Sequence, residues 1–284
     1  TEFALPSILG MLVNGAYNVI DSIFLGQAMG EIGLSTATVA MPVMTVFMAI
    51  AMLVGNGGNA LAALRMGEGK PEEAERSLGN TVTLSLVASV VVAIVMFVPA
   101  CIDGLLSVSG ATPEDWDYAM QFIRIISLGF IFQCIGMGVN NFIRTAGAPN
   151  RALGTMIIGA VACTAFNALF VLVMGMGVVG SALATVCGQA ISCATVLWYF
   201  CLTKGVPMRL RLRMMPLHGE TVRLILSLGL ASFAVQAGMA AVNFVLNNLL
   251  NMYGAQSPIG AEGALASIGV VQRVASFVVL PLIG

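Results

Sequence analysis

Charge is what this sequence lacks most. Of its 284 residues, only 9% are charged, while 58% are hydrophobic. A soluble domain carries about 25% charged residues, so this chain has too little polar surface to fold in water alone. Its formal net charge of −1 provides no basic face, which excludes a nucleic-acid partner. The composition predicts an all-α, polytopic membrane helix bundle.

Groups that support catalysis or hold cofactors are scarce as well. The six cysteines contain no CxxC pair, and the single histidine, His218, lies outside the apolar segments. Gly67-Glu-Gly-Lys70 does not form a phosphate-binding loop, because the lysine is followed by Pro71 rather than by serine or threonine. The apolar segments hold no HExxH motif and no pair of aspartates, so a serine or metal protease mechanism lacks its base or its ligands. We therefore expect no enzyme activity and no cofactor other than a coupling ion.

Long apolar segments make up most of what is present. Several exceed the 20 or so residues that a helix needs to cross a bilayer, which predicts tilt or extension beyond it. The eight predicted spans cover residues 3–26, 33–64, 77–102, 117–144, 152–174, 178–203, 221–252 and 263–284.

The basic residues alternate across these spans. Ten of the twelve lie in or beside the loops after the second, fourth and sixth spans, and the opposite loops hold acidic residues without Lys or Arg. The positive-inside rule places the basic loops, and with them the amino terminus, in the cytoplasm. We expect a multi-pass protein of the cell (inner) membrane.

Asp21 lies within the first apolar span. Asn14, Tyr17 and Asn18 share its helical stripe, because positions 14, 17, 18 and 21 follow i, i+3, i+4, i+7 spacing. A carboxylate at membrane depth is costly unless it faces a bundle interior or a wet cavity. One interpretation is a polar stripe that joins helices. The other is an ion or proton site in a transporter.

The spans begin to repeat after the sixth. Residues 3–26 resemble 228–251, with Asn18 falling on Asn243 at an offset of 225. This predicts two parallel halves of six spans each, of which the chain holds the first half and the opening of the second. The predicted divisions are 1–205, a basic cytoplasmic linker 206–218 and 219–284, with about four further spans expected beyond Gly284. The linker's Arg209-Leu-Arg-Leu-Arg stretch either lies along the anionic inner leaflet or is an ordinary positive-inside loop.

Several motifs along the whole chain resemble those of one transporter family. They are Asn18-Val-Ile-Asp-Ser-Ile-Phe-Leu-Gly26, Gly55-Asn-Gly-Gly-Asn-Ala60, Ile123-Arg-Ile-Ile-Ser-Leu-Gly129, Phe142-Ile-Arg-Thr-Ala-Gly147, Asn167-Ala-Leu-Phe170 and Gly175-Met-Gly-Val-Val-Gly-Ser-Ala-Leu-Ala-Thr185. This pattern is similar to that of the multidrug and toxic compound extrusion (MATE) family. The resemblance implies two six-helix lobes that export amphipathic, often cationic compounds against an inward flow of protons or sodium ions.

The resemblance also implies a cation site in the first lobe. The family builds it from an Asp, an Asn and a second Asp four residues apart, and a Thr, which here correspond to Asp21, Cys163, Asn167 and Thr185. Cys163 and Asn167 depart from the pattern and leave one carboxylate instead of two. A lone carboxylate suits a proton better than a bare sodium ion, so we expect proton coupling, with a sodium ion at Asp21 as the alternative.

Polar residues elsewhere in the spans are candidates for a substrate cavity. We assign this role to Asn14, Tyr17, Gln236, Asn243 and Arg273 and place Asn18 beside Asp21 at the coupling site. The stripe of Gln236, Asn243, Asn247 and Asn251 is explained equally well by hydrogen bonds between helices. Arg273 either faces the cavity or pairs with an acid, for which Asp21 is a candidate.

These observations predict a secondary active efflux transporter that works by alternating access with Asp21 as its coupling residue. The expected partners are a small amphipathic or cationic substrate and the lipid bilayer, and we expect a monomer. The alternative is a lipid-linked precursor flippase of the same superfamily, which would need a more cationic cavity than Arg124 and Arg273 provide.

Overall fold

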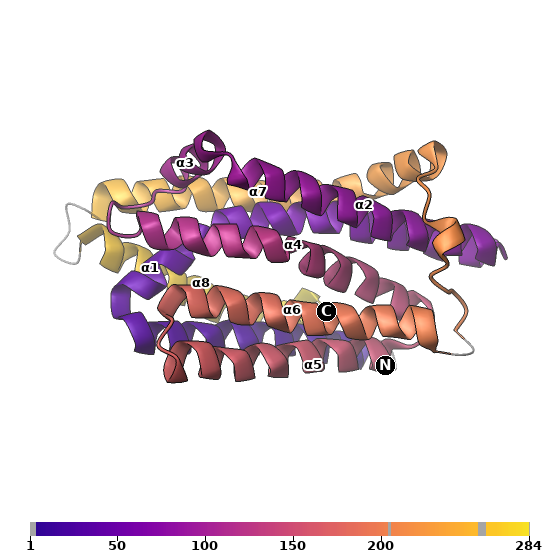
Figure 1. The fold of residues 1–284 in the computed structure, drawn as a ribbon, viewed down its shortest axis with the longest axis horizontal. Coiled ribbons are helices and arrows are strands. Elements are labelled where there is room, and N and C mark those ends of the chain that lie inside the picture. The colour runs from indigo at the N-terminus through magenta and orange to yellow at the C-terminus, as the bar shows by residue number, and fades with distance from the viewer. Residues whose placement is uncertain (1–3, 204–205, 255–259, 284) are drawn as a thin grey trace.

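The structure, a computed structural model, describes residues 4–203, 206–254 and 260–283. All regular elements in these ranges are helices, which confirms the predicted all-α bundle. Figure 1 shows them as long rods side by side, with the turns gathered at the two ends. In chain order they are α1 (Ala4–Gly67), α2 (Pro71–Phe97), α3 (Pro99–Val108), α4 (Trp116–Thr145), α5 (Pro149–Asn167), the π-helical η1 (Ala168–Val173), α6 (Gly177–Leu202), the short 3-10 helix η2 (Leu212–Met214), α7 (Gly219–Gly254) and α8 (Gly260–Ile283).

Each predicted span falls on helix, and six helices in the described part are long and apolar enough to cross a membrane. They are Ile23–Gly67, Pro71–Phe97, Trp116–Thr145, Pro149–Val173, Gly177–Leu202 and Gly219–Gly254. The predicted third span, 77–102, is wrong at both ends. Its helix begins at Pro71 and ends at Phe97, where extended Val98 precedes Pro99 and a separate helix starts.

A loop predicted between the first two spans is absent. The chain turns at Gly30 alone, which has φ 63° and ψ −137° inside α1, so both spans belong to one bent element. These angles favour glycine, because a side chain there would clash with the backbone. A one-residue corner therefore joins the segment that carries Asp21 to the segment that follows it.

The turns define two ends of the bundle. At the acidic end lie the Gly30 corner, the 109–115 loop and the 174–176 turn. The basic end carries the 68–70 turn, the 146–148 turn and the segment from residue 203 to His218, of which 204 and 205 are not described. Figure 1 shows the two sets of turns at opposite sides of the molecule, in agreement with the alternation of charge in the sequence.

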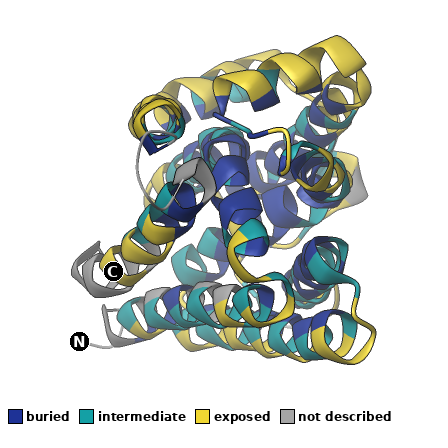
Figure 2. Cartoon of the chain, turned by 90° about the vertical axis from the view of Figure 1, so that its left-hand side faces the viewer, coloured by how far each residue is buried: buried dark blue, intermediate teal, exposed yellow. Residues whose placement is uncertain are grey.

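Burial follows the packing of the helices. Buried residues concentrate where helices face one another, and outward faces are exposed (Figure 2). One buried cluster includes Phe47, Ile123 and Phe130, and a second includes Leu78 and Phe142. Large aliphatic side chains, such as those at positions 94, 161 and 245, lie exposed on the outer faces. An apolar exterior around a helical core is what a bilayer requires of a protein.

Helix α7 lies along the second segment of α1. A Cβ on Gly229 would clash with the Leu53 carbonyl oxygen, so the two backbones meet there. Nearer the acidic end, the Asn247 amide donates to the Thr38 carbonyl at 3.1 Å. Such small-residue contacts and amide bonds are how helices associate in lipid. The division of the chain at 205 and 219 stays a prediction.

Candidate functional site

Asp21 lies on the first segment of α1 and faces α6. The hydroxyl of Ser181, in the second turn of α6, donates to Asp21 Oδ1 at 2.8 Å. Ser181 is fully buried and Asp21 is half-buried, so the carboxyl group lies at the inner face of the bundle rather than toward lipid. A hydroxyl can donate to a carboxylate or accept from a carboxylic acid, which makes this contact compatible with both charge states.

The other residues predicted for the coupling site gather on α5 and α6. Asn167 donates from Nδ2 to Cys163 Sγ at 3.7 Å, one helical turn away, and Thr185 stands one turn beyond Ser181. Cys163 and Thr185 line one cavity, and the Cys163 thiol lies close enough to Asp21 to be influenced by its charge. The structure therefore brings Asp21, Cys163, Asn167 and Thr185 together.

The chain reversal between α5 and α6 positions these groups. α5 ends at Asn167 and continues as the π-helical turn η1, and α6 begins after a tight turn in which Gly175 and Gly177 have φ of 65° and 54°. π-Helical turns often occur at functional sites because they redirect side chains. The Oδ1 atom of Asn167 is buried and has no hydrogen-bond partner within the described residues. It is an acceptor available to a proton donor or a cation.

A cavity of about 120 Å³ opens beside this group. It lies between α1, α4, α5 and α6, and its lining is Val13, Gln133, Met137, Met156, Gly159, Ala160, Cys163, Thr185, Gly188, Gln189 and Ser192. The Oε1 atoms of Gln133 and Gln189 are buried and lack a hydrogen-bond partner in the part of the chain that the structure describes. A cavity of this size has room for water molecules or for part of a small organic molecule. Methionines adapt their shape to varied ligands.

Sequence reasoning missed Ser181, Gln133 and Gln189. Ser181, Thr185 and Gln189 are each four residues apart, so they form one polar stripe on α6, and this spacing was visible in the sequence. Gln133 has no such signal, because its place beside the cavity depends on how α4 packs against α5 and α6.

Four predicted residues have side chains outside the described part of the structure. They are Asn14, Tyr17 and Asn18 on α1 and Arg273 on α8. The roles assigned to them stay predictions.

The two candidates on α7 do not line the 120 Å³ cavity. Asn243 accepts a hydrogen bond from Gln272 of α8 at 3.4 Å, and Gln236 is half-buried. Asn251 donates to the Gly110 carbonyl at 3.1 Å. With the Asn247–Thr38 bond, this agrees with the interpretation of the asparagine stripe as hydrogen bonding between helices.

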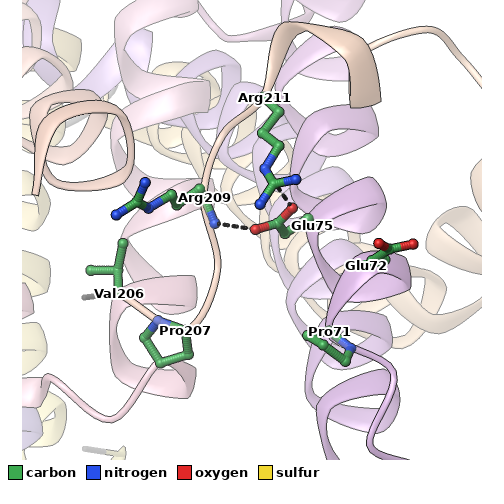
Figure 3. A pocket seen from close by; sticks show the side chains of 7 residues that line it. All are labelled: Pro71, Glu72, Glu75, Val206, Pro207, Arg209 and Arg211. Carbon is green, nitrogen blue, oxygen red and sulfur yellow. Dashed lines mark hydrogen bonds and ion pairs between the residues drawn. The ribbon is translucent and has the colours of Figure 1, made fainter. Parts of the chain in front are cut away.

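The linker at the basic end docks on α2. The Arg209 backbone N–H donates to Glu75 Oε1 at 3.0 Å, and the Arg211 guanidinium lies 3.1 Å from Glu75 Oε2. Figure 3 shows the Arg211 side chain turned toward Glu75, while the Arg209 side chain points away. Thr83 donates to the Met215 carbonyl at 2.8 Å. The basic stretch is therefore an extended segment held by protein contacts, and 212–214 is the only helical part of residues 206–218.

A cavity of about 330 Å³ lies between the linker and the start of α2 (Figure 3). Its lining residues are Pro71, Glu72, Glu75, Val206, Pro207, Arg209 and Arg211. It is far along the chain from the Asp21 group and lies at the basic end, so we treat it as a feature of the linker. No group of three or more His, Cys, Asp or Glu side chains gathers as a metal site among the described residues.

Comparison with known proteins places the chain in a family. The MatE family model matches residues 6–169. The multidrug export protein MepA of Staphylococcus haemolyticus is 23% identical over 287 residues, and so is MepA of Staphylococcus aureus, each match covering the whole chain and 60% of the relative. The chain thus spans about 60% of the length of these relatives.

Solved structures of MATE transporters match the fold. The MATE multidrug transporter DinF-BH, solved in complex with a ligand, has a TM-score of 0.91 and 31% identity, covering 99% of this chain and 61% of that one. A transporter of the MOP superfamily from Pyrococcus furiosus has a TM-score of 0.85 and 26% identity, covering 99% and 60%. The match to the family model spans more than half of the chain, the fold agrees throughout, and the chain belongs to the MatE family of multi-pass membrane transporters.

Proposed function

We propose that the protein is a secondary active efflux transporter that exports amphipathic or cationic compounds in exchange for protons or sodium ions, with Asp21 as its coupling residue. The observation that carries the proposal is the Ser181–Asp21 hydrogen bond of 2.8 Å beside Cys163 and Asn167. A carboxyl group inside a bundle, partnered by a hydroxyl that tolerates either charge state, is suited to bind and release a cation.

The coupling step is a change of charge at the interface of α1, α5 and α6. While Asp21 is ionised, Ser181 donates to it. When Asp21 takes up a proton, the Ser181 hydroxyl rotates and accepts a hydrogen bond from the protonated carboxyl group. The two states favour different packing of the first α1 segment against α6, and the Gly30 corner allows that segment to tilt. Alternating access then follows from movement between the two halves of the full-length protein.

The donor set supports a proton more strongly than a sodium ion. Asp21 is the single carboxylate of the group, and a sodium ion needs several oxygen ligands and negative charge. If sodium is the coupling ion, its ligands come from Asp21, Asn167 Oδ1 and the hydroxyls of Ser181 and Thr185.

The candidate substrate site is the 120 Å³ cavity between α1, α4, α5 and α6. The relatives are named as multidrug exporters, and one related multidrug transporter was solved with a ligand bound. The 120 Å³ cavity is suited to part of such a compound because its lining combines methionines with the free acceptors of Gln133 and Gln189. Further candidate cavity residues, toward the second half, are Asn14, Tyr17, Gln236, Asn243 and Arg273.

The test is gradient-driven efflux of a fluorescent cationic dye from cells that express the full-length protein. Asp21→Asn should abolish efflux without loss of folded protein, and a Ser181→Thr variant should retain it. A pH jump and a sodium jump applied separately identify the coupling ion. Native efflux in the Asp21→Asn cells would refute the proposal.

A further inference from the structure

A second buried carboxyl group lies at the acidic end, far from Asp21. Asp115 precedes the first residue of α4 and is fully buried. Its partners are hydroxyls: Ser35 donates to Oδ2 at 2.5 Å, Thr112 donates to Oδ2 at 3.0 Å, and Thr36 approaches Oδ1 at 3.3 Å. No ion pair joins Asp115 to a basic side chain within the described residues, and a fully buried acid without a cation beside it is rare in proteins.

The two oxygens of Asp115 are not equally well supplied with donors. Oδ2 receives two hydrogen bonds, one of them short. Among the described residues, Oδ1 has one hydrogen-bond partner, Thr36, whose single hydroxyl proton is also directed to the Ile32 carbonyl at the shorter distance of 2.7 Å. When that proton goes to Ile32, Thr36 presents a lone pair to Oδ1. A proton on Oδ1 then completes the hydrogen bond, so the neutral acid satisfies every group in the cluster.

Charged groups around Asp115 do not supply the missing stabilisation. Glu114 precedes it, and three exposed acids share the same end, at positions 31 in α1, 103 in α3 and 117 in α4. The polar residues that α7 brings to this end within the described ranges are the asparagines at 247, 248 and 251 and the exposed Tyr253. The nearest basic residue along α4 is Arg124, nine residues away and thus about 13 Å along the helix.

The electrostatics follow from this geometry. Burial raises the pKa of Asp115 above its ordinary value of 3.8, the hydroxyl donors partly oppose the rise, and the charge of Glu114 adds to it. An acid with a raised pKa stabilises its packed state below the ordinary value and loses that contribution as pH rises through the raised value. The packing around Asp115 is therefore strongest in acid and weakens as the group ionises.

The Asp115 cluster supports the contact of α7 and α8 with the rest of the chain. Thr38, one turn after Ser35, accepts the Asn247 bond and lies against Gly269 of α8. On the other side, Gly110 of the loop that carries Asp115 accepts the Asn251 bond. A change of packing at Asp115 therefore affects both hydrogen bonds that hold α7 at this end, the bond to Thr38 in α1 and the bond to Gly110 in the loop.

We propose that Asp115 is a proton-binding group, separate from the Asp21 site, whose protonation holds the acidic end of the bundle closed. The ligand is a proton from the solution at that end, which adds to Oδ1 and bonds to Thr36. Loss of the proton leaves a buried carboxylate with too few donors, and the 109–115 loop separates from the start of the second α1 segment. This inference concerns packing and does not depend on transport or on the role of Asp21.

Trp116 provides a direct reporter. It follows Asp115, is half-buried and packs against the buried cluster, whereas Trp198 is 62% exposed. The experiment is a fluorescence titration from about pH 3.5 to about pH 9 of the full-length protein in lipid nanodiscs, with every tryptophan except Trp116 replaced by phenylalanine. We expect a one-proton transition with a midpoint above 3.8, with emission shifting to longer wavelength as pH rises.

Three variants decide the origin of the transition. Asp115→Asn mimics the neutral acid, because its amide can donate to Thr36, and should remove the transition and keep the short-wavelength emission at every pH. Glu114→Gln removes an exposed neighbouring carboxylate and should keep the transition. If Asp115→Asn does not fold, Ser35→Ala decides instead, since it removes a donor to the ionised form and should move the midpoint upward by up to about one pH unit. A transition that persists in Asp115→Asn, or a Ser35→Ala midpoint equal to the native one, would overturn the proposal.

Discussion

Among the described residues, each end of the bundle buries one carboxyl group, and the two groups have different partners. At the basic end, Glu75 is 6% exposed and meets a guanidinium and a backbone N–H. At the acidic end, Asp115 is fully buried and meets only hydroxyls among the described side chains. A guanidinium and a backbone N–H can only donate hydrogen bonds, whereas a hydroxyl both donates and accepts and therefore fits the ionised and the neutral form of an acid. A buried carboxyl group is thus held by donors alone at one end and by hydroxyls at the other.

The anchor ties the linker to the bundle. Glu75, Asn80 and Thr83 on α2 bond to linker residues, with His218 N–H donating to Asn80 at 2.8 Å. The linker therefore moves with α2, and movement of α7 relative to α2 must begin near Gly219. At the acidic end, asparagines of α7 bond to the backbone carbonyls of Thr38 and Gly110, and the buried acid there, Asp115, forms no ion pair within the described residues.

The largest expected effect comes from forcing the linker off Glu75. A Cβ on Gly79 would lie 2.5 Å from the Met214 carbonyl oxygen, and backbone cannot rotate away as a side chain can. We expect Gly79→Ala to destabilise linker docking by about 2 kcal/mol and to speed tryptic cleavage after Arg209 and Arg211 roughly thirtyfold. Gly104→Ala, where a Cβ meets nothing within 4 Å, is the control. Equal cleavage rates in the two variants would contradict the docking geometry.

Removing only the charge of Glu75 should have a smaller effect. Glu75→Gln keeps an oxygen for the Arg209 N–H and loses the attraction to Arg211, whose side chain is 57% exposed and partly screened by water. We expect tryptic cleavage of the linker to rise about tenfold, equivalent to about 1.4 kcal/mol. Glu72→Gln, on the exposed rim of the same cavity, should cleave at the native rate. If both variants match the native protein, Glu75 is not an anchor.

At the acidic end, the comparison predicts dependence on pH rather than on charge pairing. Ser35→Ala should leave the packing unchanged in acid, where Asp115 is neutral, and weaken it as pH rises. The Ser35 hydroxyl lowers the pKa of Asp115, so its loss should raise that pKa further and move the Trp116 transition upward by up to about one unit. Thermal unfolding at about pH 4.5 and about pH 8 provides a second measurement. Equal loss of stability at both values would mean that Ser35 contributes packing alone.

The smallest effect is expected at the exposed ion pairs of the basic end. Hydrogen bonds from Arg65 and Lys70 lower the pKa of Glu68, so any stability it contributes is present at neutral pH and is lost as pH falls through the lowered value. Because Glu68 is exposed, Glu68→Gln should change the rate of linker cleavage less than about twofold. Raising the salt concentration should not enlarge this difference between the variant and the native protein, because salt screens exposed ion pairs. An effect as large as that of Glu75→Gln would show that burial does not decide which acids anchor this end.

Several features could be predicted from the sequence because they depend on local composition. The helical bundle, the position of the spans and the alternation of basic loops follow from apolar runs and from the scarcity of charge, which any lipid-embedded chain must satisfy. The grouping of Cys163 with Asn167 was implied by the resemblance to the MATE family. Asp21 was identified because a carboxyl group in an apolar run is costly wherever it lies.

Other features depend on contacts between segments that are distant in the chain. The sequence does not reveal that Ser181 reaches Asp21 across 160 positions, or that Ser35 meets Asp115 across 80. Asp115 looked like one more acid in a polar loop, and only the packing of that loop on α1 buries it. Composition and periodicity report what each segment prefers, so they determined the class of protein. The partners of each polar group are decided by how the helices pack, so only the tertiary structure decided that Glu75 meets a guanidinium while Asp115 meets hydroxyls.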